Sequence, residues 1–304
     1  MSNSPLVSIV ILTHNHDSSI SKNLDMILDQ DYDNIEIIVG DDASSDATPL
    51  ILKQYKQSHP DKITIILNES KLGITGNCNS ALSVCSGKYI TFNGGDDQML
   101  PGKISTQVDY LESHPDCDLC YHNMEAFDAK TDEVLYYTHL DGNGRRKRDI
   151  GNVRDAIKEG VFFSPVSAMI RMADIPKNLF DTRLPNTSDW LFFVEVLAQG
   201  GGQAEYIDAI LGRYARSINS ITINRPKDFV IEIDLLNSCN ILLVKFPQYY
   251  KQILYRYSRL IFRMRNKDKE NYAKYLKTSL GIKITLKALI AYLLYIGTLG
   301  RVRK

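Results

Sequence analysis

The chain lacks the glycine-rich loops that usually hold nucleotide phosphates. No G-x-G-x-x-G follows its first apolar run, and no G-x-x-x-x-G-K-[ST] occurs in its 304 residues. Its one glycine cluster, Gly200-Gly201-Gly202, follows a helical pattern and is expected to end that helix. A nucleotide would therefore be held by side chains and a metal ion rather than by a glycine cradle.

Cysteine is scarce, and no leader sequence is evident. The five cysteines form no even set, and Cys117 and Cys120 have zinc-like spacing without a second pair of ligands. We expect these two residues to lie in a strand of a protein from a reducing compartment. The apolar run 6–12 is too short for a signal peptide and lacks a basic stretch before it. These absences predict a cytoplasmic protein.

Net charge is also absent, but the zero total hides an uneven distribution. From Lys245 to Lys304 the chain has fifteen basic and two acidic residues, which leaves +13 there and −13 in residues 1–244. An acidic body with a basic tail predicts that the tail meets an anionic partner, either nucleic acid or a phospholipid surface.

The apolar stretch 280–299 does not read as a membrane span. A span needs about 20 mostly apolar residues, and Lys283 and Lys287 interrupt this one. An amphipathic helix in a membrane interface is favoured, with packing on the protein's own core as the alternative. Nucleic acid would not require an apolar face, so we predict an anionic membrane partner, no nucleic acid, and a peripheral position on the inner face of the plasma membrane. The predicted apolar face consists of Leu286, Leu289, Ile290, Leu293 and Leu294.

The first 127 residues alternate strand and helix patterns. Apolar, β-branched runs predict parallel strands at 7–13, 35–39, 63–67 and 88–92. Helical patterns lie between them, at 20–28, 46–58 and 76–86, with Gly87 placed to end the third helix, and Pro101 opens another.

This order predicts an α/β fold: a mostly parallel, Rossmann-like sheet with helices on both faces. After residue 127 the alternation breaks, with short strands predicted at 133–138 and 166–171 and a basic loop at 145–148. After 227 only helical patterns remain. We divide the chain into a domain at 1–222, with a nucleotide-binding half (1–127) and an acceptor half (128–222), and a helical basic extension at 223–304.

Polar clusters follow three of the predicted strands. They are Thr13-His14-Asn15, Asp41-Asp42 and Asp96-Asp97. Ligands bind beyond the carboxyl ends of the strands in such sheets, so we expect these clusters to meet at one edge. Two adjacent carboxylates repel each other unless a cation lies between them, and Mg²⁺ or Mn²⁺ prefers such oxygen ligands. A solvated acidic turn is the alternative for Asp96-Asp97.

One more carboxylate stands out in the second half. Asp189 lies in the segment 186–190, which opens an apolar helix over 191–197. Helix capping alone accounts for an aspartate there, so the pattern leaves a structural and a catalytic role open.

Taken together, these motifs resemble those of the inverting family 2 glycosyltransferases, which have the nucleotide-diphospho-sugar transferase (GT-A) fold. Each motif is weak alone, but their order and spacing are specific, and the resemblance covers about residues 5–222. The matching segments are 7–15, 37–46, 68–73, 87–90, 95–97 and 188–190.

The resemblance implies a role for each matching residue. Asp189 would be the general base that takes the proton from the acceptor hydroxyl, and Asp42 would bind a base ring N–H such as that of uracil. Asp96 or Asp97 would hold Mn²⁺ or Mg²⁺ against the donor diphosphate. The expected nucleotide-sugar-binding residues are Thr13, His14, Asn15, Asp42, Gly73, Asn79, Gly95 and Asp96.

The sequence departs from the family pattern at two places. Gly94 replaces the first aspartate of the usual Asp-x-Asp metal motif, and Ser217 replaces a histidine that often follows a late Tyr-Arg stretch. Which of Asp96 and Asp97 binds the metal is left open by the first change, and neighbouring Arg216 is a candidate to supply the charge lost by the second.

The expected activity is transfer of a sugar, with inversion, from a UDP-sugar to a saccharide or lipid-linked saccharide in cell-surface glycan assembly. Two alternatives stay open: a non-catalytic nucleotide-sugar-binding protein of the same fold, and a nucleotidyltransferase. The absence of a glycine-rich basic loop after the first strand argues against the latter.

Overall fold

The structure is a computed structural model that describes residues 4–145, 149, 151–160, 163–216 and 229–298. Its N-terminal half alternates strands and helices as predicted. The elements are β1 (Val7–Thr13), α1 (Ile20–Leu28), β2 (Ile35–Asp41), α2 (Thr48–Ser58), β3 (Ile63–Leu67), α3 (Gly73–Leu82) and β4 (Tyr89–Gly94). The four strands pair in parallel, in the order β3-β2-β1-β4.

The second half extends the same sheet with mostly antiparallel pairs. Beyond β4 the order is β8-β6-β9-β5, and β7 pairs with the outer part of β6. The elements are β5 (Gln98–Met99), α4 (Lys103–Ser113), β6 (Leu119–Asp128), β7 (Val134–Tyr137), α5 (Val153–Glu159), β8 (Ala168–Arg171), α6 (Ser188–Gln199) and β9 (Ala204–Arg216), with 3-10 turns at Pro165–Ser167 and Met172–Asp174. The predicted α/β class with a mostly parallel sheet is confirmed, although sequence patterns missed β5 and β9.

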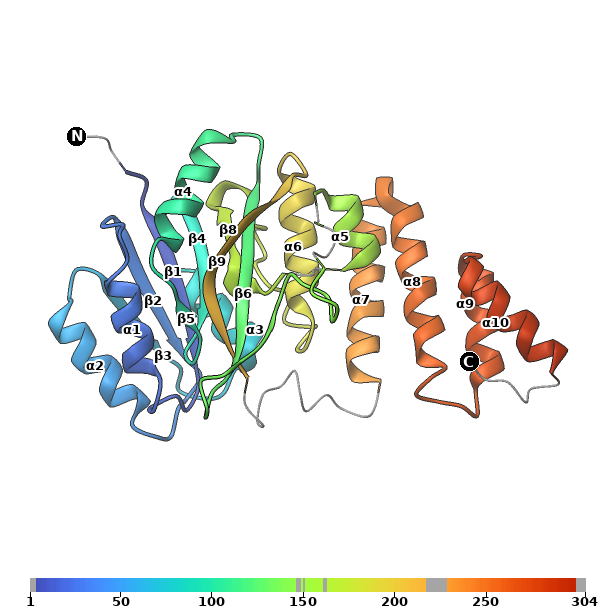
Figure 1. Cartoon of the computed structure of the whole chain (residues 1–304), viewed down its shortest axis with the longest axis horizontal. Coiled ribbons are helices and arrows are strands. Elements are labelled where there is room, and N and C mark those ends of the chain that lie inside the picture. The colour runs from blue at the N-terminus through green and yellow to red at the C-terminus, as the bar shows by residue number, and fades with distance from the viewer. Residues whose placement is uncertain (1–3, 146–148, 150, 161–162, 217–228, 299–304) are drawn as a thin grey trace.

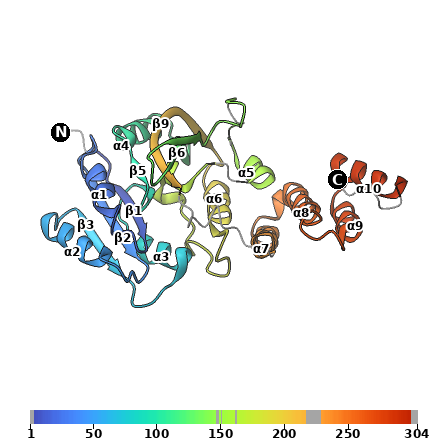
Figure 2. The same ribbon diagram turned by 60° about the horizontal axis from the view of Figure 1, so that its bottom comes forward.

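Helices cover both faces of the sheet because neighbouring strand residues point to opposite sides. Ile9 and Ile11 of β1 pack in one apolar core with residues of α1 and α4. Val10, between them, packs in a second core with residues of α3 and α6. Figures 1 and 2 show these layers on the two sides of the strands.

One predicted helix end is wrong. We expected the third helix to span 76–86 with Gly87 ending it, but α3 begins at Gly73 and ends at Leu82. Gly87 instead lies against β1, where an added Cβ would collide with the backbone nitrogen and hydroxyl of Ser8. Glycine is needed there for close approach of two backbones and not for a helix cap.

The C-terminal extension is helical, as predicted, but its two pairs of helices pack differently. Its elements are α7 (Val230–Lys245), a 3-10 turn at Pro247–Tyr249, α8 (Tyr250–Met264), α9 (Tyr272–Ile282) and α10 (Leu286–Gly297). Cys239 and Leu242 of α7 and Ile253 and Leu260 of α8 belong to the same core as α6. α9 and α10 form a small separate cluster at the end of the molecule farthest from the sheet (Figure 1).

No helix among the described residues is both long and apolar enough to cross a membrane. The predicted boundary at 222/223 falls in the segment 217–228, outside the described residues, as do most of the basic loop 145–148 and Arg301, Arg303 and Lys304.

Candidate active site

The carboxyl ends of β1, β2 and β4 meet at one edge of the sheet. Thr13 lies opposite Asp41 in the β1–β2 register, and Leu12 lies opposite Gly94 in the β1–β4 register. Backbone hydrogen bonds continue past the strands, from the Asp42 nitrogen to the Thr13 oxygen and from the Gly95 nitrogen to the Leu12 oxygen, both 2.9 Å. The three predicted polar clusters therefore start from neighbouring points of one edge.

Asp42 is buried and holds the start of α3. Its two carboxylate oxygens accept hydrogen bonds from the backbone nitrogens of Leu72 (2.6 Å) and Gly73 (3.1 Å). Gly73 has φ of +73°, a conformation that glycine adopts without strain. A carboxylate has about four acceptor positions, so two remain for a ligand donor.

The residues after β1 form the floor of the site. The Thr13 hydroxyl and His16 Nδ1 lie 3.1 Å apart, and an added Cβ on Gly95 would collide with both side chains. Gly95 is therefore required by close packing across the edge.

Two predicted residues of this segment have different surroundings. His14 Nε2 lies 3.2 Å from the Lys71 ammonium, while its Nδ1 is buried without a partner among the described residues. Asn15 has φ of +57°, and its side-chain oxygen accepts from the Ser45 nitrogen at 2.8 Å, so it joins two edge loops. Lys71 lies inside the 68–73 motif, but sequence reasoning did not single it out.

Asp96 and Asp97, which the sequence could not tell apart, have different environments. Asp97 is buried, and its carboxylate accepts from the backbone nitrogens of Gly94 (3.2 Å) and of Ala215 in β9 (2.8 Å). Burial, and secondly the charge of Asp96, raises the pKa of Asp97. Asp96 is half-buried and accepts no hydrogen bond from any described residue. Of the two carboxylates, Asp96 is thus the one whose acceptor positions are unused by the described residues.

The packing of Asp97 also accounts for Gly94. An added Cβ on Gly94 would lie 2.6 Å from Asp97 Oδ2 and 3.2 Å from Asp96 Oδ1. A larger residue at position 94, such as the usual first aspartate of the metal motif, would therefore displace the Asp97 carboxylate from its backbone partners.

Two buried polar side chains that sequence patterns did not single out hydrogen-bond to the 94–97 turn and to β4. The buried amide of Asn23 in α1 donates to the carbonyls of Gly94 and Asp97, both at 2.7 Å. The fully buried ammonium of Lys103 donates to the Thr91 hydroxyl in β4 at 2.6 Å, and burial lowers the pKa of Lys103 to about 7. A polar residue among apolar helix positions was the only available signal for either.

Asp189 lies in the first turn of α6, where a carboxylate is stabilised by the helix dipole, although it is not the N-cap residue itself. The N-cap residue is Thr187, and the only hydrogen bond that Asp189 Oδ1 accepts among the described residues is from the Trp190 nitrogen, at 2.8 Å. Burial raises the pKa of Asp189, which makes its carboxylate a stronger base than an exposed aspartate.

The start of α6 is fixed from two sides. On the sheet side, the hydroxyls of Thr75 in α3 and Ser188 lie 2.8 Å apart, which links the helix that Asp42 holds to the helix that carries Asp189. On the other side, Asp234 of α7 accepts from the Asn186 nitrogen at 2.9 Å. Helix α7 of the C-terminal extension thus takes part in positioning the Asp189 segment.

Asn79 does not join the other predicted residues through any of these contacts. Its side-chain oxygen accepts from the Phe180 nitrogen (2.9 Å) and its amide donates to the Phe180 oxygen (2.8 Å). This paired contact gives Asn79 a role in holding the segment before α6, and we leave it out of the proposed donor pocket.

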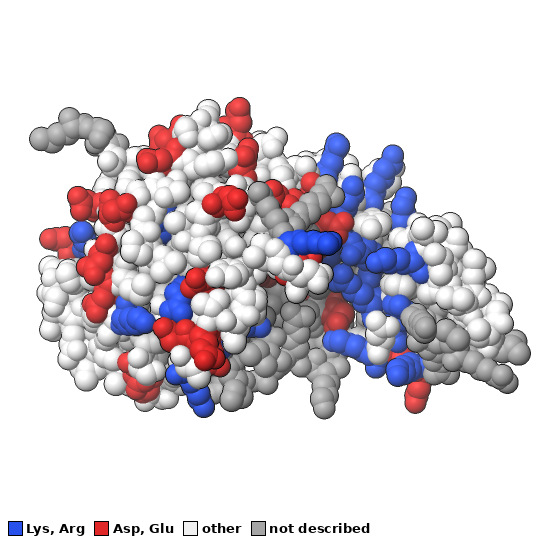
Figure 3. Space-filling model, viewed as in Figure 1, with Lys and Arg blue, Asp and Glu red and all other residues white. Residues whose placement is uncertain are grey.

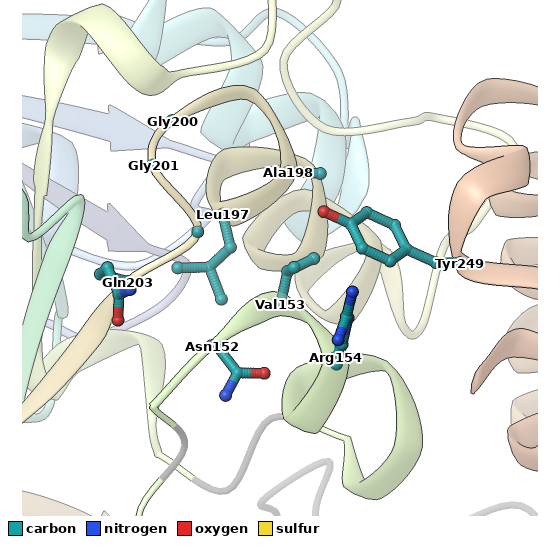
Figure 4. Close-up of a pocket in the computed structure, with 10 residues that line it drawn as sticks. Asn152, Val153, Arg154, Leu197, Ala198, Gly200, Gly201, Gln203 and Tyr249 are labelled. Atoms are coloured by element: carbon teal, nitrogen blue, oxygen red, sulfur yellow. The ribbon is translucent and has the colours of Figure 1, made fainter. Parts of the chain in front are cut away.

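A hollow in the surface lies away from the sheet edge. Figure 4 shows it between the end of α6, the start of α5 and Tyr249, with Arg154 and Gln203 in its lining. α6 has 12 residues, about 18 Å, and the hollow lies at the end opposite Asp189. The glycines beside it end α6, as predicted, and the Gly201 nitrogen donates to Asp118 rather than standing open to a phosphate.

Among the described residues, neither the cysteines nor any other cluster forms a metal site by itself. Cys117 and Cys120 are both buried free thiols. Cys120 lies in β6 as predicted, whereas Cys117 lies two positions before this strand, so the prediction is wrong for Cys117. Within the described ranges no three His, Cys, Asp or Glu side chains gather closely enough to hold an ion.

The fold and the edge define an α/β protein with a mostly parallel sheet whose polar side chains gather at the carboxyl ends of the strands. The sequence profile named Glycosyl transferase family 2 matches residues 8–175. That match covers more than half of the chain, and the chain belongs to this family.

Curated relatives agree with this assignment. A UDP-Glc:alpha-D-GlcNAc-diphosphoundecaprenol beta-1,3-glucosyltransferase, WfaP, of Escherichia coli is 28% identical over 250 residues, which are 78% of this chain and 87% of the relative. An uncharacterized protein of Mycobacterium tuberculosis (strain ATCC 25618 / H37Rv) is 36% identical over 221 residues, 71% of this chain and 60% of its own length. Several matched relatives are longer, and the chain spans 46–60% of their length.

Solved structures share the fold at low identity. Staphylococcus aureus TarS 1–349, in a structure with UDP-GlcNAc, gives a TM-score of 0.64 at 16% identity and covers 96% of this chain and 80% of its own. The mannosyltransferase PcManGT of Pyrobaculum calidifontis, in a structure with GDP-Man and Mn²⁺, gives 0.61 at 18% identity, with 98% and 81% covered. The predicted GT-A fold is thereby confirmed.

Proposed function

We propose that the chain is an inverting, metal-dependent glycosyltransferase that moves a sugar from a UDP-sugar to a hydroxyl of a lipid-linked saccharide. The observation that carries the proposal is the contrast between tied and free carboxylates around one edge. Asp42 and Asp97 are held by backbone nitrogens, whereas Asp96 and Asp189 accept little or nothing and remain available for chemistry. The activity named for the Escherichia coli relative, a UDP-Glc:alpha-D-GlcNAc-diphosphoundecaprenol glucosyltransferase, supports the donor and acceptor classes.

The residues at the edge fit a cation held by one carboxylate. Asp96 is partly exposed and has no described hydrogen-bond partner, and Asp97 is already occupied by Gly94 and Ala215. Mg²⁺ and Mn²⁺ are commonly bound by one or two carboxylates together with substrate phosphates and water. The ion would supply positive charge to the departing diphosphate.

The chain's own residues do the remaining work. Asp42, with two free acceptor positions, would accept the ring N–H of uracil, and Thr13, His14 and Gly95 would line the base and ribose. Lys71, 3.2 Å from His14, would place a second positive charge near the diphosphate. Asp189 would take the proton of the acceptor hydroxyl, on the opposite side of the anomeric carbon from the leaving group.

The proposed acceptor lies at a membrane surface. A lipid-linked saccharide presents its reactive hydroxyl near a bilayer, and the basic C-terminal helices would meet the anionic surface there. The domain division at 1–222 and 223–304 serves the same purpose, with transfer in the first part and surface contact in the second.

The test is turnover of defined donors with and without metal. The purified chain is incubated with UDP-sugars, GDP-mannose and a diphosphopolyprenyl saccharide, and product is followed by mass spectrometry. We expect transfer from a UDP-sugar, loss of transfer in EDTA, and recovery with Mn²⁺ or Mg²⁺. Full activity in chelator would overturn the metal dependence.

The same experiment addresses the non-catalytic alternative. Binding of UDP without turnover of any donor, with or without acceptor, would favour a nucleotide-sugar-binding protein over an enzyme. Asp96→Asn in parallel should lose metal-stimulated activity but keep its melting temperature, because no described hydrogen bond is removed.

A further inference from the structure

The last described helix has its large apolar side chains on the outside. In α10, Leu286 is 73% exposed and Leu293 is 59% exposed, and Leu289, Ile290, Leu294 and Ile296 are exposed as well. With about 100° per residue, these six positions fall on one side of the helix. Soluble helices normally turn such a stripe toward the core.

The opposite side of α10 makes the contact with the protein. Ala288 and Ala291 are buried, and Tyr292 and Tyr295 are partly buried against the cluster that contains Tyr272 and Leu276 of α9. Small residues and tyrosines thus face inward while leucine and isoleucine face outward. No described element covers the outward stripe, and Ile284 just before the helix extends it at 70% exposed.

The charge around this stripe limits what can cover it. The sequence has no acidic residue after Glu270, and Lys274, Lys277, Lys283 and Lys287 are all exposed. A second copy would bring these like charges together, whereas an anionic partner would be attracted. Figure 3 shows Lys and Arg gathered over the α8 region, beside a largely uncharged surface at the α9–α10 end.

Three basic residues of α7 and α8 contact other parts of the protein, unlike the exposed lysines of α9 and α10. Arg259 pairs with Glu159 at 2.8 Å, and Lys245 pairs with the buried Glu195 at 2.7 Å. Arg256 is buried, with its guanidinium 5.2 Å from the Trp190 ring centre and 3.1 Å from the Glu159 oxygen. These three cations hold α7 and α8 on the sheet domain, whereas Lys251 and Arg263 of α8 are exposed.

We propose that α10 is the element that inserts into a membrane, lying in the plane of an anionic lipid surface with its leucine–isoleucine stripe in the interface. At 12 residues, about 18 Å, α10 is shorter than the roughly 30 Å hydrocarbon core and lies along the surface rather than across it. Lys283 and Lys287 meet the lipid headgroups, while α7 and α8 tie this anchor to the helix that carries Asp189. This inference deepens the proposed function and rests on it only for the reason that the acceptor is membrane-borne.

The test is vesicle flotation of the full chain and of two matched variants. Leu293→Glu places a carboxylate in the middle of the stripe, and Val244→Glu places one at an 83% exposed position on α7. With vesicles of phosphatidylcholine and phosphatidylglycerol, we expect Leu293→Glu to lower the bound fraction by about tenfold or more, because burial of one leucine is lost. Val244→Glu should bind like the parent.

A second variant separates the electrostatic contribution to membrane binding from the apolar contribution. The double variant Lys283→Gln, Lys287→Gln should bind mixed vesicles about 30-fold less tightly and bind pure phosphatidylcholine vesicles unchanged, since each lysine contributes only near an anionic surface. Added salt should weaken the parent and not abolish its binding, because apolar insertion is not screened.

Equal flotation of the parent and Leu293→Glu would overturn the assignment. A parent that is dimeric without vesicles, with a monomeric Leu293→Glu variant, would also overturn it and make the stripe a contact between copies. Calorimetry with UDP keeps this test apart from the proposed function: flotation that depends on α10 together with no UDP binding would refute the enzyme and leave the membrane contact standing.

Discussion

At the sheet edge, polar side chains are buried; in α10, apolar side chains are exposed. Asp97 and Asn23 are 3% and 1% exposed, whereas Leu286 is 73% exposed. Both regions depart from the usual placement of apolar residues inside and charged residues outside, and they do so in opposite directions. Hydrogen bonds to backbone stabilise Asp97 and the amide nitrogen of Asn23, although Asn23 Oδ1 has no partner among the described residues. No described element covers the exposed leucines.

The comparison teaches where to look for ligands. Asp97 is buried, and its carboxylate accepts from two backbone nitrogens, so it is committed to the scaffold. Asp42 has two backbone donors but also acceptor positions left for a ligand, and Asp96 and Asp189 have more of their acceptor positions unused among the described residues. An exposed apolar stripe of this size likewise marks a contact surface. The two regions are joined by α7 and α8, which pack on α6.

The largest expected effect tests whether the edge is catalytic. Asp189→Asn should lower transfer by about 10²-fold or more, since an amide cannot take the acceptor proton, while UDP affinity and melting temperature stay close to the parent. Initial rates and calorimetry measure this. Asp181→Asn is the control, because Asp181 is a nearby carboxylate already paired with Arg183 at 2.5 Å. Near-parental turnover of Asp189→Asn would leave that residue only a structural role.

The second prediction compares two residues predicted to bind the nucleotide-sugar, Asp42 and Asn79, by their effects on UDP affinity and on stability. Asp42→Ala should weaken UDP binding by about 1.5–3 kcal/mol, the scale of a hydrogen bond to a charged group, and should also lower the melting temperature, because the Leu72 and Gly73 nitrogens lose their acceptor. Asn79→Ala should leave UDP affinity unchanged and lower the melting temperature, because Asn79 bonds only the Phe180 backbone among the described residues. Equal loss of affinity in both variants would show that this distinction is wrong.

A buried cation beneath the edge gives a test of stability. Lys103→Met should raise the free energy of unfolding near pH 7 by about 1–2 kcal/mol, because the desolvation cost of the ammonium is removed and the Thr91 hydroxyl keeps its bond to the Ala168 oxygen at 2.7 Å. Urea unfolding measures it.

The stability of the parent protein and of Lys103→Met should depend differently on pH, and the direction of the difference can be predicted. Burial lowers the pKa of Lys103 from 10.5 to about 7, so between these values the unfolded chain binds more protons and the parent gains stability as pH rises. The Met variant should lack this gain, and the difference between the two should shrink toward pH 10.5. A difference that does not change with pH would contradict the lowered pKa.

The smallest effect concerns the junction of the two regions. Arg259→Gln removes a partly exposed ion pair with Glu159 and should lower stability by less than about 1 kcal/mol, with activity unchanged. Thermal unfolding in low and high salt measures it, and the difference should vanish in high salt. A large loss of activity would mean that α8 affects Asp189 more directly than packing indicates.

Local patterns were enough for much of this protein. Alternation of apolar runs predicted the four parallel strands, because a buried parallel strand and an amphipathic helix each leave a periodic signature in a few neighbouring residues. The motifs placed Thr13, Asp42 and Asp96-Asp97 at strand ends, and the helical repeat of leucines marked the stripe of α10.

Tertiary structure decided what these residues are free to do. Asp97 is held by the nitrogen of Ala215, 118 positions away, and Asn79 by Phe180, 101 positions away. No periodic pattern encodes such pairings, so the sequence could not choose between Asp96 and Asp97 or set Asn79 apart. The same reason applies to the tail: its charge is visible in the sequence, but only packing shows that Lys245, Arg256 and Arg259 are used against the catalytic domain and that α10 is left open.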